Sequence, residues 1–414
     1  MLSKLKKLYF DTLYSSLPDK VLWIAFSLLL LIHCIENTSV IYSDLNWVQG
    51  MYFFRNFLYL LLVFRIAFFS FYRTGEIIFA GVFLLTGFFS LLGSRDFGLF
   101  ELFIIMFAVK DLSAQKIVKV FAFIKGAATV ATPLLWKVGL LSAIYYQDDT
   151  VGYYNTYGFC HRNVMGANIA ILCLAWFYLR YQKLKLRDVI VWIGIALITY
   201  KFAVSRTSLI IMLLIILATY LTKIYEQRLV TLPDLRKIVI FGFGIMLLIS
   251  ILGTIFFTQD SVVWRIIDSI FTKRFRYAHY CLQEYGLSMF GQKIAFISSL
   301  EAQNVGTKKL ILDNAYMRAI LYYGLIPGAL FLWTYGKALS VSVRKKDFPL
   351  LIGLAVFAVY GLSERYMLDV YYQFPLVAAW CAYFFKSGGK DVQTRKIPLE
   401  YAGEVIQFCK RIRQ

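Results

Sequence analysis

Runs of about 20 apolar residues recur along the whole chain, and this repetition constrains the fold more than any other feature. A run of that length crosses a bilayer core of roughly 30 Å as a helix. A helix satisfies its own backbone hydrogen bonds, so it is one of the few structures that a membrane permits. Hydrophobic residues make up 60% of the 414, and only 16% are charged. We therefore predict an all-α, polytopic integral membrane protein.

The hydropathy pattern predicts about twelve transmembrane helices. The expected spans are 21–36, 48–70, 76–93, 97–110, 117–145, 163–180, 188–204, 206–224, 238–258, 315–336, 348–364 and 368–386. Two are weak, because Arg55 and Arg65 interrupt the second and the short fourth contains Glu101. No internal repeat typical of inverted-repeat transporters is visible. We predict one transmembrane domain at 1–386 and a basic cytoplasmic tail at 387–414.

Basic residues are concentrated in every second connection between these spans. The basic connections are 110–119, 180–187, 223–237, 337–346 and the tail. The other connections are 36–44, 95–96, 147–163, 205–206 and 259–310. The positive-inside rule assigns the basic set to the cytoplasm, so both termini are expected inside. The net charge of +20 then indicates contact with anionic lipid and not with nucleic acid.

Residues 259–314 are predicted to form a large, partly helical loop outside the cell. Between Gln259 and Leu310 this segment carries seven Lys or Arg and four acidic residues, a net charge of +3. The positive-inside tendency disfavours such an excess on the outer side, so the loop suggests an anionic ligand there. We interpret Lys308 and Lys309 as surface charge.

Two arginines near the outer membrane face are candidate ligands of that anion. Arg206 stands in a tight Ser-Arg-Thr hairpin between two apolar runs. It is either an interfacial arginine or a phosphate ligand, because a guanidinium offers phosphoryl oxygens a planar fork of donors. Arg274 opens an amphipathic helix with Lys273 and Arg276, which either lies on the membrane surface or contributes to a site.

Three further polar positions lie where spans meet the outer face. Asp313 is either a helix N-cap or a general base for a hydroxyl nucleophile. His161 is a base, a donor to phosphate or a helix-start residue. The neighbours Glu364 and Arg365 are interpreted as a local ion pair.

Four segments together resemble one family of membrane enzymes. They read GFCHRNVMG (158–166), SRTSLI (205–210), KRFRYAHYCLQEYGLSMFGQ (273–292) and DNAYMRAILYYGLIPGALF (313–331). Their order resembles the O-antigen polymerase and ligase superfamily over residues 150–370, and most closely its Wzy-type polysaccharide polymerases. Asp313-Asn314 stands where the ligases usually have His-Asn, and Arg162 stands where proline is common.

The resemblance implies a GT-C-like glycosyltransferase at the outer face of a bacterial cytoplasmic membrane. Such an enzyme joins undecaprenyl-diphosphate-linked repeat units, as donor and acceptor, into capsule, O-antigen or exopolysaccharide. It implies no metal and no cofactor, and a flippase and a chain-length regulator as partners. Arg206 and Arg274 would clamp the diphosphate, and Asp313 would activate or orient the acceptor hydroxyl. The other implied binding residues are His161, Asn163, Arg276, Asn314, Arg318 and Arg365.

Other functions remain open at the level of sequence. A ligase would differ from a polymerase only in its acceptor. A flippase for lipid-linked oligosaccharide would also need cations for the diphosphate, but we would expect two related halves. A non-catalytic scaffold would use the basic loop only as a lipid contact. The sugars, their linkage and the stereochemical outcome are not encoded in any motif that we recognise.

Overall fold

The computed structural model describes residues 17–42, 45–70, 74–110, 112–142, 144–148, 152–297 and 309–384. This part of the chain is mostly helical, with one short hairpin, two isolated bridges and irregular connecting loops. In the hairpin, β1 (Tyr145–Asp148) and β2 (Gly152–Asn155) pair antiparallel. The hairpin is a small addition to the predicted all-α class, which the rest of the described chain supports. It also ends the predicted 117–145 span early, because the helix there stops at Lys137.

The longer helices are α2 (Leu17–Glu36), α3 (Leu45–Phe69), α4 (Thr74–Ser94), α6 (Ala114–Lys137), α7 (Arg162–Arg180), α8 (Leu186–Ala203), α9 (Arg206–Ile224), α11 (Leu235–Ile255) and α16 (Leu325–Arg344). The shorter helices are α5 (Gly98–Ala108), α10 (Glu226–Thr231), α12 (Val262–Ile270), α13 (Arg274–Tyr285), α15 (Ala315–Met317), α17 (Phe348–Tyr360) and α18 (Phe374–Tyr383). Single turns are η1 (Ser39–Tyr42), η2 (Tyr181–Lys183), the π-helical turn η3 (Arg318–Tyr322) and η4 (Arg365–Met367).

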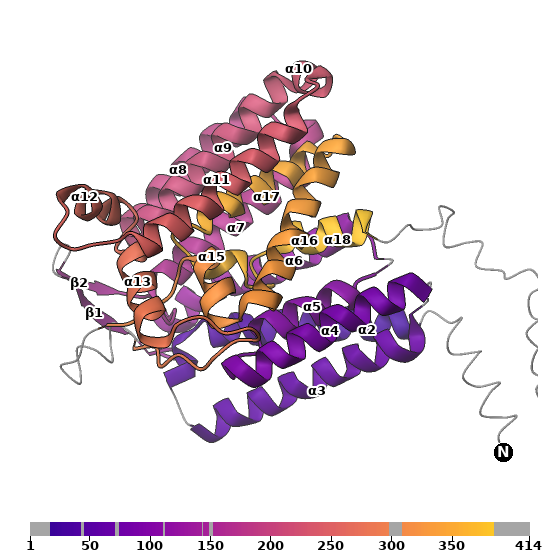
Figure 1. Ribbon diagram of the computed structural model, residues 1–414, viewed down its shortest axis with the longest axis horizontal. Helices are drawn as coiled ribbons and strands as arrows, with labels where there is room; N and C mark the ends of the chain where they lie inside the picture. Colours follow the sequence, from indigo (N-terminus) through magenta and orange to yellow (C-terminus); the bar gives the residue numbers. More distant parts are fainter. Residues whose placement is uncertain are drawn as a thin grey trace, which may run out of the picture.

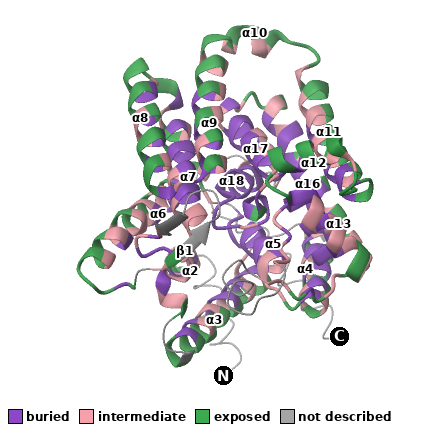
Figure 2. Ribbon diagram, turned by 90° about the vertical axis from the view of Figure 1, so that its left-hand side faces the viewer, coloured by how far each residue is buried: buried purple, intermediate pink, exposed green. Residues whose placement is uncertain are grey.

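Within the described residues, seven helices are long and apolar enough to cross a membrane: α2, α3, α4, α6, α7, α9 and α11. Their outward faces carry large apolar side chains, such as Phe53 at 78% exposed and Phe241 at 71%. Figure 2 shows exposed residues along the outer faces of α3, α8, α9 and α11. Lipid is the environment in which such a surface is stable. The structure therefore supports a helical membrane protein, and the seven such helices in its described residues do not confirm all twelve predicted spans.

Three predicted spans correspond to helices that are too short for a bilayer core. These are α5 with 11 residues, α17 with 13 and α18 with 10. At 1.5 Å per residue, each is shorter than the roughly 30 Å of hydrocarbon. All three lie at the centre of the molecule and are buried almost all round (Figure 2). They form a core that the longer helices enclose, which explains why they are apolar on every face.

The predicted 315–336 span is broken into α15, η3 and α16. The break lies at Gly324, whose φ of +102° suits glycine and few other residues. A Cβ at Gly324 would lie 2.3 Å from the backbone nitrogen of Gly291. The same close approach lets the carbonyls of Ser288 and Met289 accept from the first amides of α16, at 2.9 and 3.1 Å. The loop after α13 is thereby fixed against the start of α16.

The polar segments lie at two ends of the molecule. In Figure 1, α12, α13 and the hairpin lie at one end, and α10 lies at the other. The predicted outer loop and the predicted cytoplasmic connection at 223–237 are therefore on opposite sides. Which compartment each end faces stays a prediction. The predicted tail at 387–414 and residues 298–308 of the loop lie outside the described residues.

Candidate active site

The guanidinium of Arg274 joins three segments that are distant in sequence. Arg274 is the first residue of α13 and is 8% exposed. Its Nη1 lies 2.7 Å from Oδ2 of Asp313, and its Nη2 lies 3.2 Å from Oε1 of Glu364. Its Nε donates to the carbonyl of Ser363 at 2.7 Å. The predicted outer loop is thus tied to the turn between α17 and η4 by one side chain.

Asp313 is positioned by its neighbour Asn314, which is fully buried. The side-chain oxygen of Asn314 caps α15 by accepting from the amide of Met317 at 3.0 Å. Its side-chain nitrogen donates to Oγ of Ser250 and to the carbonyl of Leu362, both at 3.1 Å. Asn314 is therefore the cap that we considered for Asp313, and Asp313 is left to contact Arg274.

Residues from the start of α7 approach the same carboxylates. Nδ2 of Asn163 lies 3.4 Å from Oε1 of Glu364. Nδ1 of His161 accepts from the amide of Asn163 at 3.1 Å and so caps α7. Burial, followed by the positive charge of Arg162, lowers the pKa of His161 to about 4. The imidazole is therefore neutral at physiological pH, and its contact with the Asn163 amide supports the helix-start interpretation of His161.

Asp313 and Glu364 both contact Arg274, but their pKa values are shifted in opposite directions. Burial alone would raise the pKa of Asp313, but the charges of Arg274 and Arg365 outweigh burial and lower it. Burial raises the pKa of Glu364 to about 7, because Arg274 offsets it only in part and Asp313 adds a like charge. At neutral pH, Asp313 is thus an ionised carboxylate and Glu364 is close to half-protonated.

Lys309 is closer to this cluster than its interpretation as surface charge implied. Burial and the charge of Arg274 lower its pKa, while Asp313 and Glu364 oppose that change. Its Nζ lies 5.9 Å from the ring centre of Tyr277 in α13. Lys309 therefore adds a second cation beside Arg274. Lys308 lies outside the described residues.

Arg318 lies on the π-helical turn and connects the cluster to a cavity. Its Nη1 donates to the carbonyl of Leu312 at 3.2 Å, and its Nη2 lies 3.8 Å from Oδ2 of Asp96. Asp96 also accepts from Tyr323 and from the amide of Gly98, each at 2.8 Å. Burial tends to raise the pKa of Asp96, but Arg318 and the Gly98 amide lower it overall. π-Helical turns occur frequently at functional sites.

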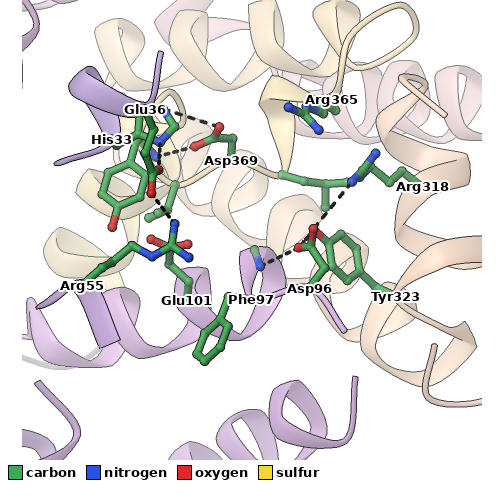
Figure 3. Close-up of a pocket in the computed structure, with 14 residues that line it drawn as sticks. His33, Glu36, Arg55, Asp96, Phe97, Glu101, Arg318, Tyr323, Arg365 and Asp369 are labelled. Atoms are coloured by element: carbon green, nitrogen blue, oxygen red, sulfur yellow. Dashed lines mark hydrogen bonds and ion pairs between the residues drawn. The ribbon is translucent and has the colours of Figure 1, made fainter. Parts of the chain in front are cut away.

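The cavity has a volume of about 230 Å³ and lies between α2, α3, α5, η3 and η4 (Figure 3). Its lining is mostly polar. The residues that line it are His33, Glu36, Arg55, Asp96, Phe97, Gly98, Glu101, Arg318, Tyr323, Arg365, Leu368, Asp369, Val370 and Tyr371. Arg55 and Glu101, which made two predicted spans look weak, both face this cavity. These two charged residues interrupt apolar runs, and that interruption was the feature of the sequence that pointed to the site.

Glu364 and Arg365 face opposite ways, so their interpretation as a local ion pair is wrong. Glu364 has an extended backbone, with φ of −140° and ψ of +146°. Arg365 begins the helical turn η4, so the backbone changes conformation between the two residues. Glu364 accordingly pairs with Arg274, whereas Arg365 lines the cavity. Among the residues that the structure describes, no carboxylate lies within ion-pair distance of Arg365.

Two predicted arginines lie outside the cluster. Arg276 pairs with the buried Asp268 at 3.3 Å, and this contact fixes α12 against α13. Arg206 is exposed at the first position of α9, and no ion pair joins it to any described residue. The serines beside it, Ser205 and Ser208, pack closely on Gly166 of α7. Arg206 thus lies near the start of α7 without contacting Arg274.

Within the described ranges, no group of three or more His, Cys, Asp or Glu side chains has the arrangement of a metal site. Comparisons with protein-family models, with curated proteins and with solved structures gave no match.

Proposed function

We propose that this protein is a membrane glycosyltransferase that polymerises undecaprenyl-diphosphate-linked repeat units at the outer face of a bacterial cytoplasmic membrane. The observation that carries the proposal is the cluster of Arg274, Asp313 and Glu364 beside a polar cavity. Charged groups at the ends of membrane helices are expensive to bury, so a connected set of them is a candidate for function. Cations and an ionised carboxylate are the groups that this reaction needs.

The diphosphate is proposed to bind on the side of Arg274 and Lys309. A diphosphate leaving group gains negative charge as the glycosidic bond breaks, and fixed cations stabilise that charge best where water is sparse. Arg206 is a proposed further ligand, since its exposed guanidinium has no ion-pair partner in the described part of the chain. Arg276 is better explained by its pair with Asp268.

Asp313 is proposed to receive the proton of the acceptor hydroxyl. The hydroxyl oxygen attacks the anomeric carbon of the donor, the new C–O bond forms, and the bond to the diphosphate breaks. Undecaprenyl diphosphate leaves with the electron pair of that bond, and the proton passes to Asp313. The side chain of Asp313 is 21% exposed, against 7% for Glu364, so it is the carboxylate that a substrate reaches more easily. A low pKa keeps it ionised for this role.

The test uses purified protein in lipid and synthetic lipid-linked repeat units. Asp313→Asn keeps the shape of the side chain and removes the proton acceptor, so polymer formation should fall about 100-fold or more. Asp260→Asn is the matched control, because Asp260 is an exposed acid in the same loop. It should retain wild-type activity.

Three outcomes would contradict the proposal. Asp313→Asn with full activity would remove Asp313 from the mechanism. A wild-type protein that forms no polymer would refute the proposed reaction. Transfer of a single glycan to a preformed lipid acceptor, without lengthening, would indicate a ligase instead.

A further inference from the structure

The fixed charges around the cavity nearly cancel. Its lining includes four carboxyl groups and three arginines. The charged residues are Glu36, Asp96, Glu101, Asp369, Arg55, Arg318 and Arg365. Arg55 lies 2.6 Å from Glu36, and Arg318 lies 3.8 Å from Asp96. A cavity in which four carboxyl groups face three arginines is a poor site for a diphosphate. The diphosphate is instead expected near Arg274 and Lys309, where protonation of Glu364 leaves a net positive charge.

Several hydrogen-bonding groups in the cavity have capacity left for a ligand. Among the described residues, the buried Nε of Arg55 has no hydrogen-bond partner, and the buried Nε2 of His33 has only Asp369 nearby, at 3.8 Å, which is beyond hydrogen-bond distance. Arg365 has no ion-pair partner among the residues described, and Figure 3 shows its guanidinium without a drawn contact. Carboxylate oxygens of Asp369 add acceptors beside these donors. Unpaired buried donors are costly, so their presence in a cavity points to a polar ligand.

Hydroxyl groups match this lining, because each one both donates and accepts a hydrogen bond. A polyhydroxylated ring can therefore contact arginines and carboxylates together. The cavity volume of about 230 Å³ is enough to accommodate a sugar ring. Phe97, Leu368 and Val370 add apolar surface to the lining.

The cavity also lies next to the carboxylate cluster. Arg365 directly follows Glu364 in the chain, and Arg318 contacts the carbonyl of Leu312 beside Asp313. A ring in the cavity would therefore have one edge near Asp313.

We propose that this cavity binds one neutral sugar ring of the lipid-linked glycan, with Arg365 as a sugar ligand and not a diphosphate ligand. The assignment rests on the proposed function for the identity of the glycan. It separates two subsites: a cationic one at Arg274 and Lys309 for the diphosphate, and a charge-balanced one for the sugar.

Binding to two lipids tests the separation. The probes are the lipid-linked repeat unit extracted from the source cells and undecaprenyl diphosphate without sugar, each titrated into purified protein in detergent. Arg365→Gln should weaken binding of the repeat unit about tenfold, as expected for a lost charged hydrogen bond. It should change binding of the bare lipid less than twofold. Arg365 makes no ion pair with a described residue, so this variant should fold normally, which thermal unfolding checks.

Two further variants complete the design. Arg274→Lys should weaken both lipids, and Arg265→Gln, at an exposed arginine of α12, should weaken neither. Equal weakening of both lipids by Arg365→Gln, or of neither, would overturn the sugar assignment. A wild-type protein that binds the repeat unit in the expected way but never lengthens it would refute the proposed reaction and leave the cavity assignment standing.

Discussion

Arg274 is shared by two carboxylates, and this sharing makes the charge of the site depend on pH. Asp313 stays ionised because Arg274 lowers its pKa, whereas burial raises the pKa of Glu364 to about 7. When Glu364 takes up a proton, Arg274 keeps only one compensating carboxylate. The net charge of the site then rises by one, which favours binding of an anionic ligand.

This titration predicts the pH dependence of substrate binding. As pH falls from 8 to 6, Glu364 becomes protonated, and affinity for the lipid-linked repeat unit should rise by up to about tenfold. The diphosphate of that lipid is fully ionised throughout this range, so it does not contribute. Glu364→Gln should bind with high affinity at every pH, because the amide keeps its acceptor oxygen for Arg274 and carries no charge. Titrations at several pH values would measure this.

A wild-type affinity that stays flat between pH 6 and 8 would contradict this protonation scheme. So would a Glu364→Gln variant that keeps the wild-type pH profile. Asp260→Asn, in the exposed part of the same loop, serves as the control and should leave the profile unchanged.

At the scale of elements, the break before α16 is the feature that the hydropathy pattern concealed. The apolar run 315–336 reads as one span, yet Gly324 and Pro327 stand where α16 begins. Glycine before a helix and proline in its first turn are start signals, so the break was visible in principle. A hydropathy average smooths over single residues such as these, so it joined α15, η3 and α16 into one predicted span.

Gly324→Ala should destabilise the protein, because a Cβ there would lie 2.3 Å from the nitrogen of Gly291 and the φ of +102° is unfavourable. Backbone strain of this kind costs about 1–3 kcal/mol, and the steric clash adds to it. Gly286→Ala is the matched control: its φ is +68°, but no atom lies within 4 Å of the added Cβ. Thermal unfolding in detergent should rank Gly324→Ala as clearly less stable than Gly286→Ala. Equal midpoints would show that the loop moves aside freely.

At the scale of the molecule, the two ends carry different kinds of residue, and their sidedness can be tested. Asp260 is exposed near α12, and Gln227 is exposed on α10 at the opposite end. A membrane-impermeant maleimide should label Asp260→Cys in intact cells and Gln227→Cys only after permeabilisation. The unsubstituted chain is the control: four of its six cysteines, at 34, 173, 281 and 381, are buried, and labelling of the partly buried Cys160 and of Cys409 sets the background to subtract. The reverse pattern would invert the predicted topology.

The sequence was sufficient for the class of the fold but not for the composition of the site. The length of each apolar run predicted a membrane helix, because a single helix can span the bilayer without contacts from other parts of the chain. The site instead depends on contacts between distant segments, such as Arg274 with Glu364. No local pattern encodes that pairing, and Asp96 and Asp369 went unnoticed for the same reason. Arg274 and Asp313 were predicted through the family resemblance, and their 2.7 Å contact is a result of the structure.

The opposite orientation of Glu364 and Arg365 also bears on how this chain tolerates engineering. The carboxylate cluster and the cavity are served by adjacent residues, Glu364 with an extended backbone and Arg365 at the start of η4. A one-residue insertion between α17 and η4 would therefore change which side chain reaches each of the two sites. Epitope tags and reporter fusions should therefore avoid this turn. The short exposed helix α10, at the far end of the molecule, is the better position for them.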